Sequence, residues 1–404
     1  MKKPHMPNNL NKYSALESYK YWWTVLSLLL ITGAVNLQVP LYHQYAEINH
    51  ASHAVSSLAF AAYVAGLVPV LFGFAGASDR MGRKLIIITA LSCSLLATLL
   101  MIFFSSMNSL FFARVLQGVS VGLAMGTVTA FLSEQRPGTE KFISAHVALA
   151  SSLGFGGGAL ATTISLMYSQ EGIPISFWIA LVAFPIVMMG MWKIPTSNKL
   201  RNVPLTRIPK FISGNISPYL AICAAWSVSG LVIALLPAQL AIHDLATWTG
   251  PALFLINIAG IVFQPMARRL TPKINMAIGC VLVPSGYLTL IYGAQQGSIL
   301  YLLLGSSIAG AACYGFTYLG GLTYVVEKAK LDKARSVSGY FLAAYVGFSV
   351  PSILLGIVAD SKGVSNALES FGFLIVLVHI VIFIMTMTAR DVIKIHIASE
   401  GLDK

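Results

Sequence analysis

Residues 76–84 read GASDRMGRK, and they lie between two long apolar segments, AVSSLAFAAYVAGLVPVLFGFA before them and LIIITALSCSLLATLLMIFF after them. Each flanking segment has the roughly 20 mostly apolar residues that a helix needs to cross the hydrocarbon core of a bilayer. The nine residues between them hold one acid, three bases and two glycines. This pattern predicts a short charged loop at a membrane surface that joins two membrane-spanning helices.

The composition of the whole chain is typical of a membrane protein. Of 404 residues, 56% are hydrophobic and 10% are charged, whereas about 25% of residues are charged in soluble domains. Apolar segments recur along the chain and predict an all-α membrane protein with twelve transmembrane helices. The expected spans are 22–44, 54–76, 85–105, 109–132, 142–165, 174–194, 217–241, 249–267, 274–294, 298–325, 336–358 and 369–389.

The basic residues follow the predicted topology. If the N-terminus is cytoplasmic, all 26 Lys and Arg residues except Arg114 and Lys362 fall in the tails and in the loops on the cytoplasmic side. The positive-inside rule therefore predicts that both termini are cytoplasmic, and it accounts for the net charge of +12 without a nucleic-acid partner. We expect a monomeric, multi-pass protein that lies in the lipid bilayer of the cell inner membrane.

A long basic connection divides the predicted spans six and six. Residues 195–216 read PTSNKLRNVPLTRIPKFISGNI and predict a cytoplasmic linker between an N-terminal six-helix bundle, 1–194, and a C-terminal bundle with a short cytoplasmic tail, 217–404. A weak internal repeat agrees, because GASDRMGRKLII after the second span aligns with PMARRLTPKINM after the eighth. Two pseudo-symmetric halves are a known transporter plan, with the substrate site between them near the midplane.

The segment SDRMGRK, residues 78–84, resembles the inner-loop signature of the major facilitator superfamily, and the resemblance extends over essentially the whole chain. It implies the fold of that family, in particular of its bacterial drug and metabolite exporters. It also implies that the loop is a conformational latch, in which Asp79 meets the inner end of the eleventh helix near Ser336. The expected latch residues are Asp79, Arg80, Gly82, Arg83 and Lys84.

The residues of this loop also have a simpler interpretation. Gly82 permits a tight turn, and the bases alone would keep the loop in the cytoplasm. A loop that sets topology and nothing else is therefore the alternative to a latch. The sequence departs from the family at Ala75, where the signature has a glycine, although Gly76 follows.

The fourth span contains a charge inside its apolar segment. LFFARVLQGVSVGLAMG, residues 110–126, holds the family's second signature, Arg-x-x-Gln-Gly, as Arg114, Gln117 and Gly118. A charged side chain inside a span is costly unless it faces a partner or a wet cavity. We expect partners in Asn36, Gln38 and Glu47. The resemblance implies a role in proton coupling, and a purely structural polar cluster is the alternative.

Two further features bear on coupling and direction. The fifth span holds His146, and an imidazole is the side chain whose ordinary pKa lies near neutral pH. We therefore place His146 with Arg114, Gln117, Gly118 and Glu47 as a coupling candidate, against the alternative of a structural histidine. The same span, ALASSLGFGGGALATT, partly resembles the family's antiporter signature, with Phe155 where the signature has a proline. This favours export. The glycine repeats in both helices are typical of close helix packing.

The first, fourth, seventh and tenth helices should line a midplane cavity if the family plan holds. An aromatic and amide-rich lining with one guanidinium suits an amphipathic organic solute, and a carboxylate on that solute could pair with the arginine. Ordinary helix packing is the alternative for the aromatic residues. The expected substrate-binding residues are Asn36, Gln38, Arg114, Trp226, Gln239, Tyr314 and Tyr318.

The sequence lacks the motifs of several other functions. It has no phosphate-binding GxxxxGK[ST] loop and no GxSxG elbow, and its four cysteines have no metal-ligand spacing. We expect no enzyme activity, no metal and no cofactor, with the proton gradient as the energy source. The expected function is proton-coupled efflux of a small organic compound such as a drug, a metabolite or a metallophore-like product. Uptake by symport or facilitated diffusion and a non-transporting receptor or scaffold are the alternatives.

Overall fold

The computed structural model describes residues 15–168, 172–195, 202–329 and 332–388. Every regular element in these ranges is a helix, and twelve segments are long and apolar enough to cross a membrane. The predicted all-α fold with twelve transmembrane helices is confirmed. The tails, 1–14 and 389–404, lie outside the described residues, so the predicted position of both termini stays a prediction.

The helices form two sets that follow each other along the chain. The N-terminal set comprises α1 (Ala15–Val35), η2 (Val39–Leu41), α2 (Tyr42–Ile48), α3 (His53–Gly73), α4 (Ala77–Met81), α5 (Arg83–Phe103), α6 (Met107–Gln135), α7 (Glu140–Tyr168) and α8 (Ile175–Trp192). The C-terminal set comprises α9 (Ser217–Ala234), α10 (Leu236–Ala241), η3 (Ala246–Trp248), α11 (Thr249–Ala267), α12 (Pro272–Gln295), α13 (Ile299–Gly310), η4 (Ala311–Phe316), α14 (Thr317–Lys328), α15 (Lys333–Lys362) and α16 (Val364–Thr388).

Three of the predicted spans are interrupted within their length. The first breaks after Val35, ahead of Pro40, and the seventh breaks after Ala234, ahead of Pro237. Proline has no N–H and collides with the preceding turn, so a helix cannot continue through it without distortion. The tenth span changes to a π-helix over Ala311–Phe316, a form that often occurs at functional sites. The hydropathy of these segments gave no sign of the interruptions.

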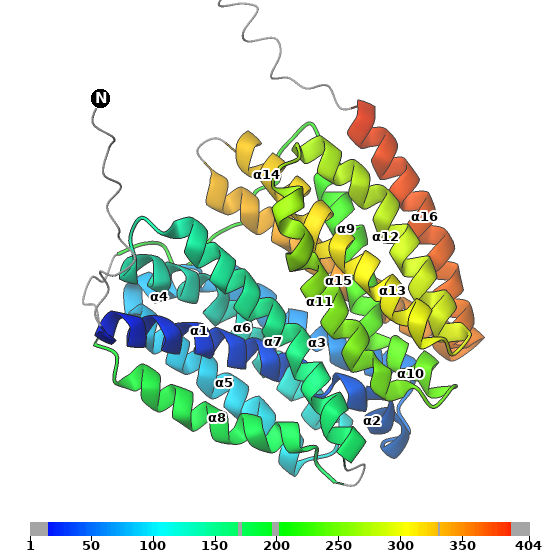
Figure 1. Ribbon diagram of the computed structural model, residues 1–404, viewed down its shortest axis with the longest axis horizontal. Coiled ribbons are helices and arrows are strands. Elements are labelled where there is room, and N and C mark those ends of the chain that lie inside the picture. The colour runs from blue at the N-terminus through cyan, green and yellow to red at the C-terminus, as the bar shows by residue number, and fades with distance from the viewer. Residues whose placement is uncertain (1–14, 169–171, 196–201, 330–331, 389–404) are drawn as a thin grey trace, which may run out of the picture.

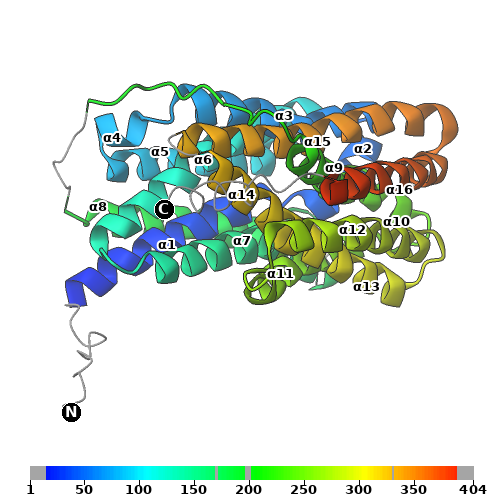
Figure 2. The same cartoon turned by 90° about the horizontal axis from the view of Figure 1, so that it is seen from above.

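The two sets approach each other at one end of the molecule. They converge near α2 and α10 and diverge toward α4 and α14 (Figure 1), and Figure 2 shows the same sets from above. The main contacts between the sets pair α3 with α15 and α7 with α11, and η2 and α2 add contacts with α11 and α10. We call the end with α4 and the start of α15 the basic end, and the end with α2 and α10 the opposite end.

Glycines set the closest helix contacts. A Cβ added at Gly118 on α6 would collide with the carbonyl of Tyr63 on α3, and one at Gly158 on α7 would collide with the carbonyl of Gly33 on α1. Small residues of this kind allow the backbones of membrane helices to approach each other. Gly126 differs, because nothing lies within 4 Å of a Cβ added there.

Candidate functional site

Arg114 on α6 is completely buried near the break in the first span. Its Nη1 donates to the carbonyl of Val35 at 2.8 Å and to Oε1 of Gln117 at 3.1 Å. The guanidinium carbon also lies 4.9 Å from the ring centre of Tyr63 and 5.5 Å from that of Phe60, both on α3. The side chain thus joins α6 to α1 and α3.

The break after Val35 explains why polar side chains gather here. The last carbonyls of a helix have no partner in the helix itself, and a cation near that end is favourable. Gln117 donates to the carbonyl of Ala34 at 3.0 Å, and Gln38 donates to that of Val35 at 2.7 Å and to Oε1 of Gln117 at 3.0 Å. Arg114, Gln117 and Gln38 therefore close the C-terminus of α1.

This capping role does not use the whole guanidinium. The Nε of Arg114 is buried and has no hydrogen-bond partner, and no carboxylate in the described part of the chain forms an ion pair with the side chain. The expected partner Glu47 instead lies 3.2 Å from His43 in an exposed pair on α2. A buried charge without a counter-ion is costly, so an anion that reached Arg114 would be bound favourably.

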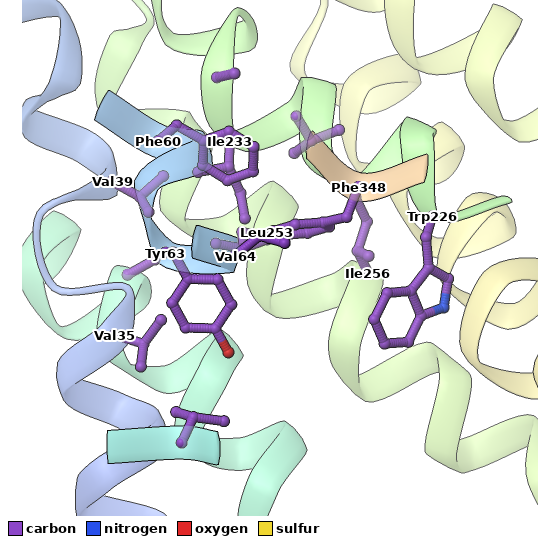
Figure 3. Close-up of a cluster of buried hydrophobic side chains, with 14 of the residues drawn as sticks. Val35, Val39, Phe60, Tyr63, Val64, Trp226, Ile233, Leu253, Ile256 and Phe348 are labelled. Carbon is purple, nitrogen blue, oxygen red and sulfur yellow. The ribbon is translucent and has the colours of Figure 1, made fainter. Parts of the chain in front are cut away.

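Arg114 lies on the wall of a cavity between the two sets. The cavity has a volume of about 70 Å³ and receives side chains from α1, α3, α6, α7, α9, α11, η4 and α15. In Figure 3 the ring of Tyr63 extends from the N-terminal set, while Phe348 and Trp226 extend from the C-terminal set. Its lining is Val35, Asn36, Tyr63, Arg114, Phe155, Trp226, Ile233, Leu253, Asn257, Tyr314, Tyr345 and Phe348.

Four of the expected substrate-binding residues line this cavity, namely Asn36, Arg114, Trp226 and Tyr314. The amide of Asn36 donates to the carbonyl of Phe155 at 2.8 Å instead of pairing with Arg114 as expected. The ring centres of Trp226 and Tyr314 are 5.5 Å apart, so these aromatics form one surface.

The other expected residues lie elsewhere. Gln38 reaches Arg114 through Gln117 without lining the cavity. Gln239 is buried toward the opposite end, where its Oε1 accepts a 2.8 Å hydrogen bond from Ser365. Tyr318 packs on Phe341, with ring centres 6.1 Å apart. Gln239 is outside the lining because the seventh span breaks before it, and Tyr318 is outside because it follows the π-helical turn.

His146 belongs to another neighbourhood. Its Nδ1 lies 2.9 Å from the carbonyl of Phe142, and its ring packs against Phe142, Tyr21 and Trp22 near the start of α7. The structure thus separates His146 from Arg114. Its proposed part in coupling stays a prediction.

Sequence reasoning missed cavity residues on α3, α7, α11 and α15, because it assigned the lining to four helices only. Asn257 could have been found, since an amide inside an apolar segment is itself a signal. Tyr63, Tyr345 and Phe348 carry no comparable signal, because aromatic residues are common throughout the spans. Their position depends on how the two sets meet.

The charged loop binds mainly within its own set. Asp79 accepts from Arg83 at 2.9 Å, and Nε of Arg83 lies 2.9 Å from Glu134 on α6. Gly82 has φ of 95°, a conformation that favours glycine, where α4 turns into α5. Lys84 donates to the carbonyls of Trp192 and Ile194.

Arg80 donates to the carbonyl of Val203 in the connection between the sets. The expected contact of Asp79 with α15 near Ser336 is not made in this structure. The two sets diverge at the basic end, and Arg83 satisfies the carboxylate there.

Comparison with known proteins agrees with this architecture. The model of the Major Facilitator Superfamily matches residues 24–351. A point mutant of the nucleoside transporter NupG has a similar structure, with a TM-score of 0.72 at 12% identity over 92% of this chain and 99% of that one, and unmutated NupG has a TM-score of 0.69 at the same identity and coverage. No curated protein matches the sequence. The family model covers most of the chain, and the chain belongs to the major facilitator superfamily of membrane transporters.

Proposed function

We propose that this transporter exports a small organic solute that carries a carboxylate and an apolar or aromatic body. In this proposal the basic end faces the cytoplasm, and the protein lies in the inner membrane as a monomer. Protons that move inward supply the energy. The bundles of residues 1–194 and 217–404 rock about the cavity, so that the site opens to one side at a time. No cofactor or metal takes part in this proposal.

The observation that carries the proposal is the buried guanidinium of Arg114 on the cavity wall, whose Nε has no hydrogen-bond partner and which pairs with no acid among the residues that the structure describes. A guanidinium pairs with a carboxylate through strong, charge-assisted hydrogen bonds. The ring centre of Trp226 lies 5.5 Å from that of Tyr314 and 5.3 Å from that of Tyr345. These rings offer an aromatic surface on the same cavity. An anion with an apolar body would satisfy both features.

The size of the cavity supports movement of the sets. A typical small-molecule site has a volume of about 300 to 1,000 Å³, whereas this cavity has about 70 Å³. The solute therefore cannot occupy it until the sets separate further. Because side chains from both sets form the wall, such a movement would enlarge the site and open it at the same time.

Uptake of a neutral solute is a second candidate. The amides of Asn36 and Asn257 and the aromatic rings of the lining suit a heterocycle such as a nucleoside, through hydrogen bonds and stacking. A non-transporting receptor or scaffold is a further alternative, although it would leave the spare donor of Arg114 without a use.

Substrate charge separates these candidates. Purified protein in liposomes should transport an aromatic carboxylic acid. The rate for its methyl ester should be at least about tenfold lower, because the ester lacks the charged acceptor. Arg114→Gln should abolish this preference, while Arg269→Gln, which alters an exposed arginine at the basic end, should keep it. Equal protein-dependent transport of acid and ester, after subtraction of the flux into protein-free liposomes, would refute the proposed substrate class.

Direction and coupling need a separate measurement. In everted vesicles with an imposed proton gradient, a transported acid should dissipate the gradient if protons exchange for solute. Entry of protons together with solute in right-side-out vesicles would instead establish uptake by symport. Solute transport without proton movement in either preparation would exclude proton coupling.

A further inference from the structure

A carboxylate bridges the two sets at the opposite end. Asp360, near the end of α15, accepts the backbone N–H of His53 at 2.7 Å through Oδ1 and that of Ala54 at 3.1 Å through Oδ2. These two N–H groups belong to the first turn of α3, 307 and 306 residues away in the sequence. The first N–H groups of a helix have no partner in the helix, and this end attracts negative charge. Asp360 therefore caps a helix of the other set.

The backbones approach closely beside this contact. Gly356 precedes Asp360 by one helical turn, and a Cβ added to it would lie 2.6 Å from Oγ of Ser57 and 2.9 Å from the carbonyl of His53. A residue with a side chain would hold the two helices apart here. Glycine at this position lets Asp360 reach the start of α3, so the contact is part of how the two sets fit together.

The clamp, by which we mean Asp360 together with the N–H groups of His53 and Ala54, is exposed to solvent. Protons from that side of the membrane can reach the carboxylate without crossing the protein. A carboxylate can accept both N–H groups, whereas a protonated carboxyl group has lost the charge and part of its acceptor capacity. Protonation would therefore weaken both hydrogen bonds and remove the attraction to the helix end.

Other titratable groups near this end have partners or positions of their own. His53 on α3 adjoins the carboxylate and acts on it electrostatically. Lys362 follows on α15 itself, and Glu369 on α16 accepts from Gln295 of α12 at 2.9 Å. On α2, His43 pairs with Glu47. The described parts of α9 and α10, which also lie nearby, contain no acid, lysine, arginine or histidine.

The central cavity offers no alternative acid. No Asp or Glu is among the residues that line it. Glu47, Glu369 and Asp79 bond to groups of their own set. Asp360 differs from these three because its carboxylate holds one set against the other, which is the property that a coupling site requires.

We propose that Asp360 is the proton-responsive clamp of this transporter: as a carboxylate it holds α3 and α15 together at the opposite end, and its protonation from that side releases them. In export, a proton from outside would then favour the state that opens outward and discharges solute. This use of the proton rests on the proposed direction of transport. The clamp itself does not, since it is a property of the protein without solute.

Distance measurements can test the clamp in the absence of any solute. Spin labels at Ser105→Cys and Gln296→Cys lie on exposed positions at the opposite end, one in each set. The four native cysteines would be replaced by alanine, and the full chain would be placed in lipid nanodiscs at several pH values between about 3 and about 7, because an aspartate that accepts backbone N–H groups takes up a proton only in the acidic part of this range. We expect the population with a long distance to grow as the pH falls.

Four variants sharpen this experiment. Asp360→Asn should show the long distance at every pH, with a ratio of open to closed protein raised about tenfold over the unmodified protein at neutral pH. Asp360→Glu keeps a titratable carboxyl group and should retain a pH response. Glu369→Gln, which alters a neighbouring titratable group, should follow the unmodified protein, and His53→Gln, which removes an electrostatic neighbour of the carboxylate, should keep a pH response.

A distance that does not change with pH in the unmodified protein, or a pH response that survives in Asp360→Asn, would overturn the clamp. A response that disappears in His53→Gln alone would assign it to the histidine and overturn the proposal equally. If the clamp fails while the acid is still transported in liposomes, the proposed function stands without it. If the clamp responds to pH and no acid is transported, the proposed substrate fails alone.

Discussion

Asp360 and Asp79 lie at opposite ends of the same helix pair, yet only one of them connects the two sets. Asp360 accepts two N–H groups from the start of α3 in the other set. Asp79, which follows the end of α3, is paired with Arg83 four residues along its own chain. A carboxylate contact therefore joins α3 to α15 at the opposite end, whereas Asp79 makes no such contact at the basic end.

The difference suggests how one contact could replace the other. The start of α15 lies at the basic end, and its N-cap residue, Asp332, makes no side-chain capping bond. This helix start could accept Asp79 in the way that the start of α3 accepts Asp360. Rocking of the sets would exchange one carboxylate contact at a helix start for the other, with the Arg114 cavity between them.

The largest expected effect comes from a larger side chain in the contact between α3 and α15 at the opposite end. Gly356→Val should prevent α15 from closing on α3, because overpacking of a close contact costs about 1 to 3 kcal/mol. Transport should fall at least about tenfold, and the spin-label distance at the opposite end should stay long at every pH. Gly126→Val is the matched control, since a Cβ at Gly126 meets nothing within 4 Å. A fully active Gly356→Val would show that this closure is not needed.

A smaller effect is expected from a change at the basic end. Asp79→Asn should leave the opposite-end distance of the resting protein unchanged, because Asp79 makes no contact with the other set in this structure. It should slow turnover about tenfold, without weakening solute binding, because the contact with α15 would form only in the other conformation. Single-turnover and equilibrium binding measurements separate the two quantities. An unchanged turnover would reduce the loop to a topology signal.

The ion pair that holds the loop should matter less. Glu134→Gln removes the partner at 2.9 Å from Nε of Arg83, and the Glu134 side chain is 42% exposed. Exposed pairs contribute about 0.2 to 1 kcal/mol. The thermal unfolding midpoint should therefore fall only slightly, with turnover changed less than about threefold. A loss as large as that of Asp79→Asn would mean that Glu134, too, takes part in the latch.

The smallest effect concerns the connection between the sets. Lys210 donates to Asp332 at 2.6 Å, and this hydrogen bond holds the pKa of the Asp332 carboxyl below its ordinary value of 3.8. Because the pKa is lowered in the folded protein, the contact stabilises the native state at pH values above the ordinary pKa. This contribution is lost as the pH falls through the lowered pKa.

The protection of residues 202–210 from hydrogen exchange, expressed relative to the intrinsic exchange rate at each pH, should accordingly fall at acidic pH in the unmodified protein. Asp332→Asn should show the lower protection throughout and lose this pH dependence. A variant whose exchange keeps the original pH profile would show that the backbone contact of Lys210 with the carbonyl of Arg335 suffices to hold the connection.

The sequence was sufficient for the spans and for singling out Arg114, which the structure places buried on the cavity wall, because long apolar segments and a charge inside one of them have direct physical meaning. It was insufficient for the break after Val35, whose free carbonyls explain the association of Arg114 with Gln117 and Gln38. Asp360 was visible only as an acid near the end of a span. Its role depends on a contact across 307 residues, which no local pattern encodes.

Two distances measured in parallel samples test the central claim most directly. One pair of labels, at residues 105 and 296, reports the opposite end, and a second pair, at the exposed positions Met81 and Arg269, reports the basic end. On the change Asp360→Asn, the first distance should lengthen while the second shortens in the same fraction of molecules. Ends that open together, or that move independently of each other, would contradict a transporter in which one carboxylate contact replaces the other.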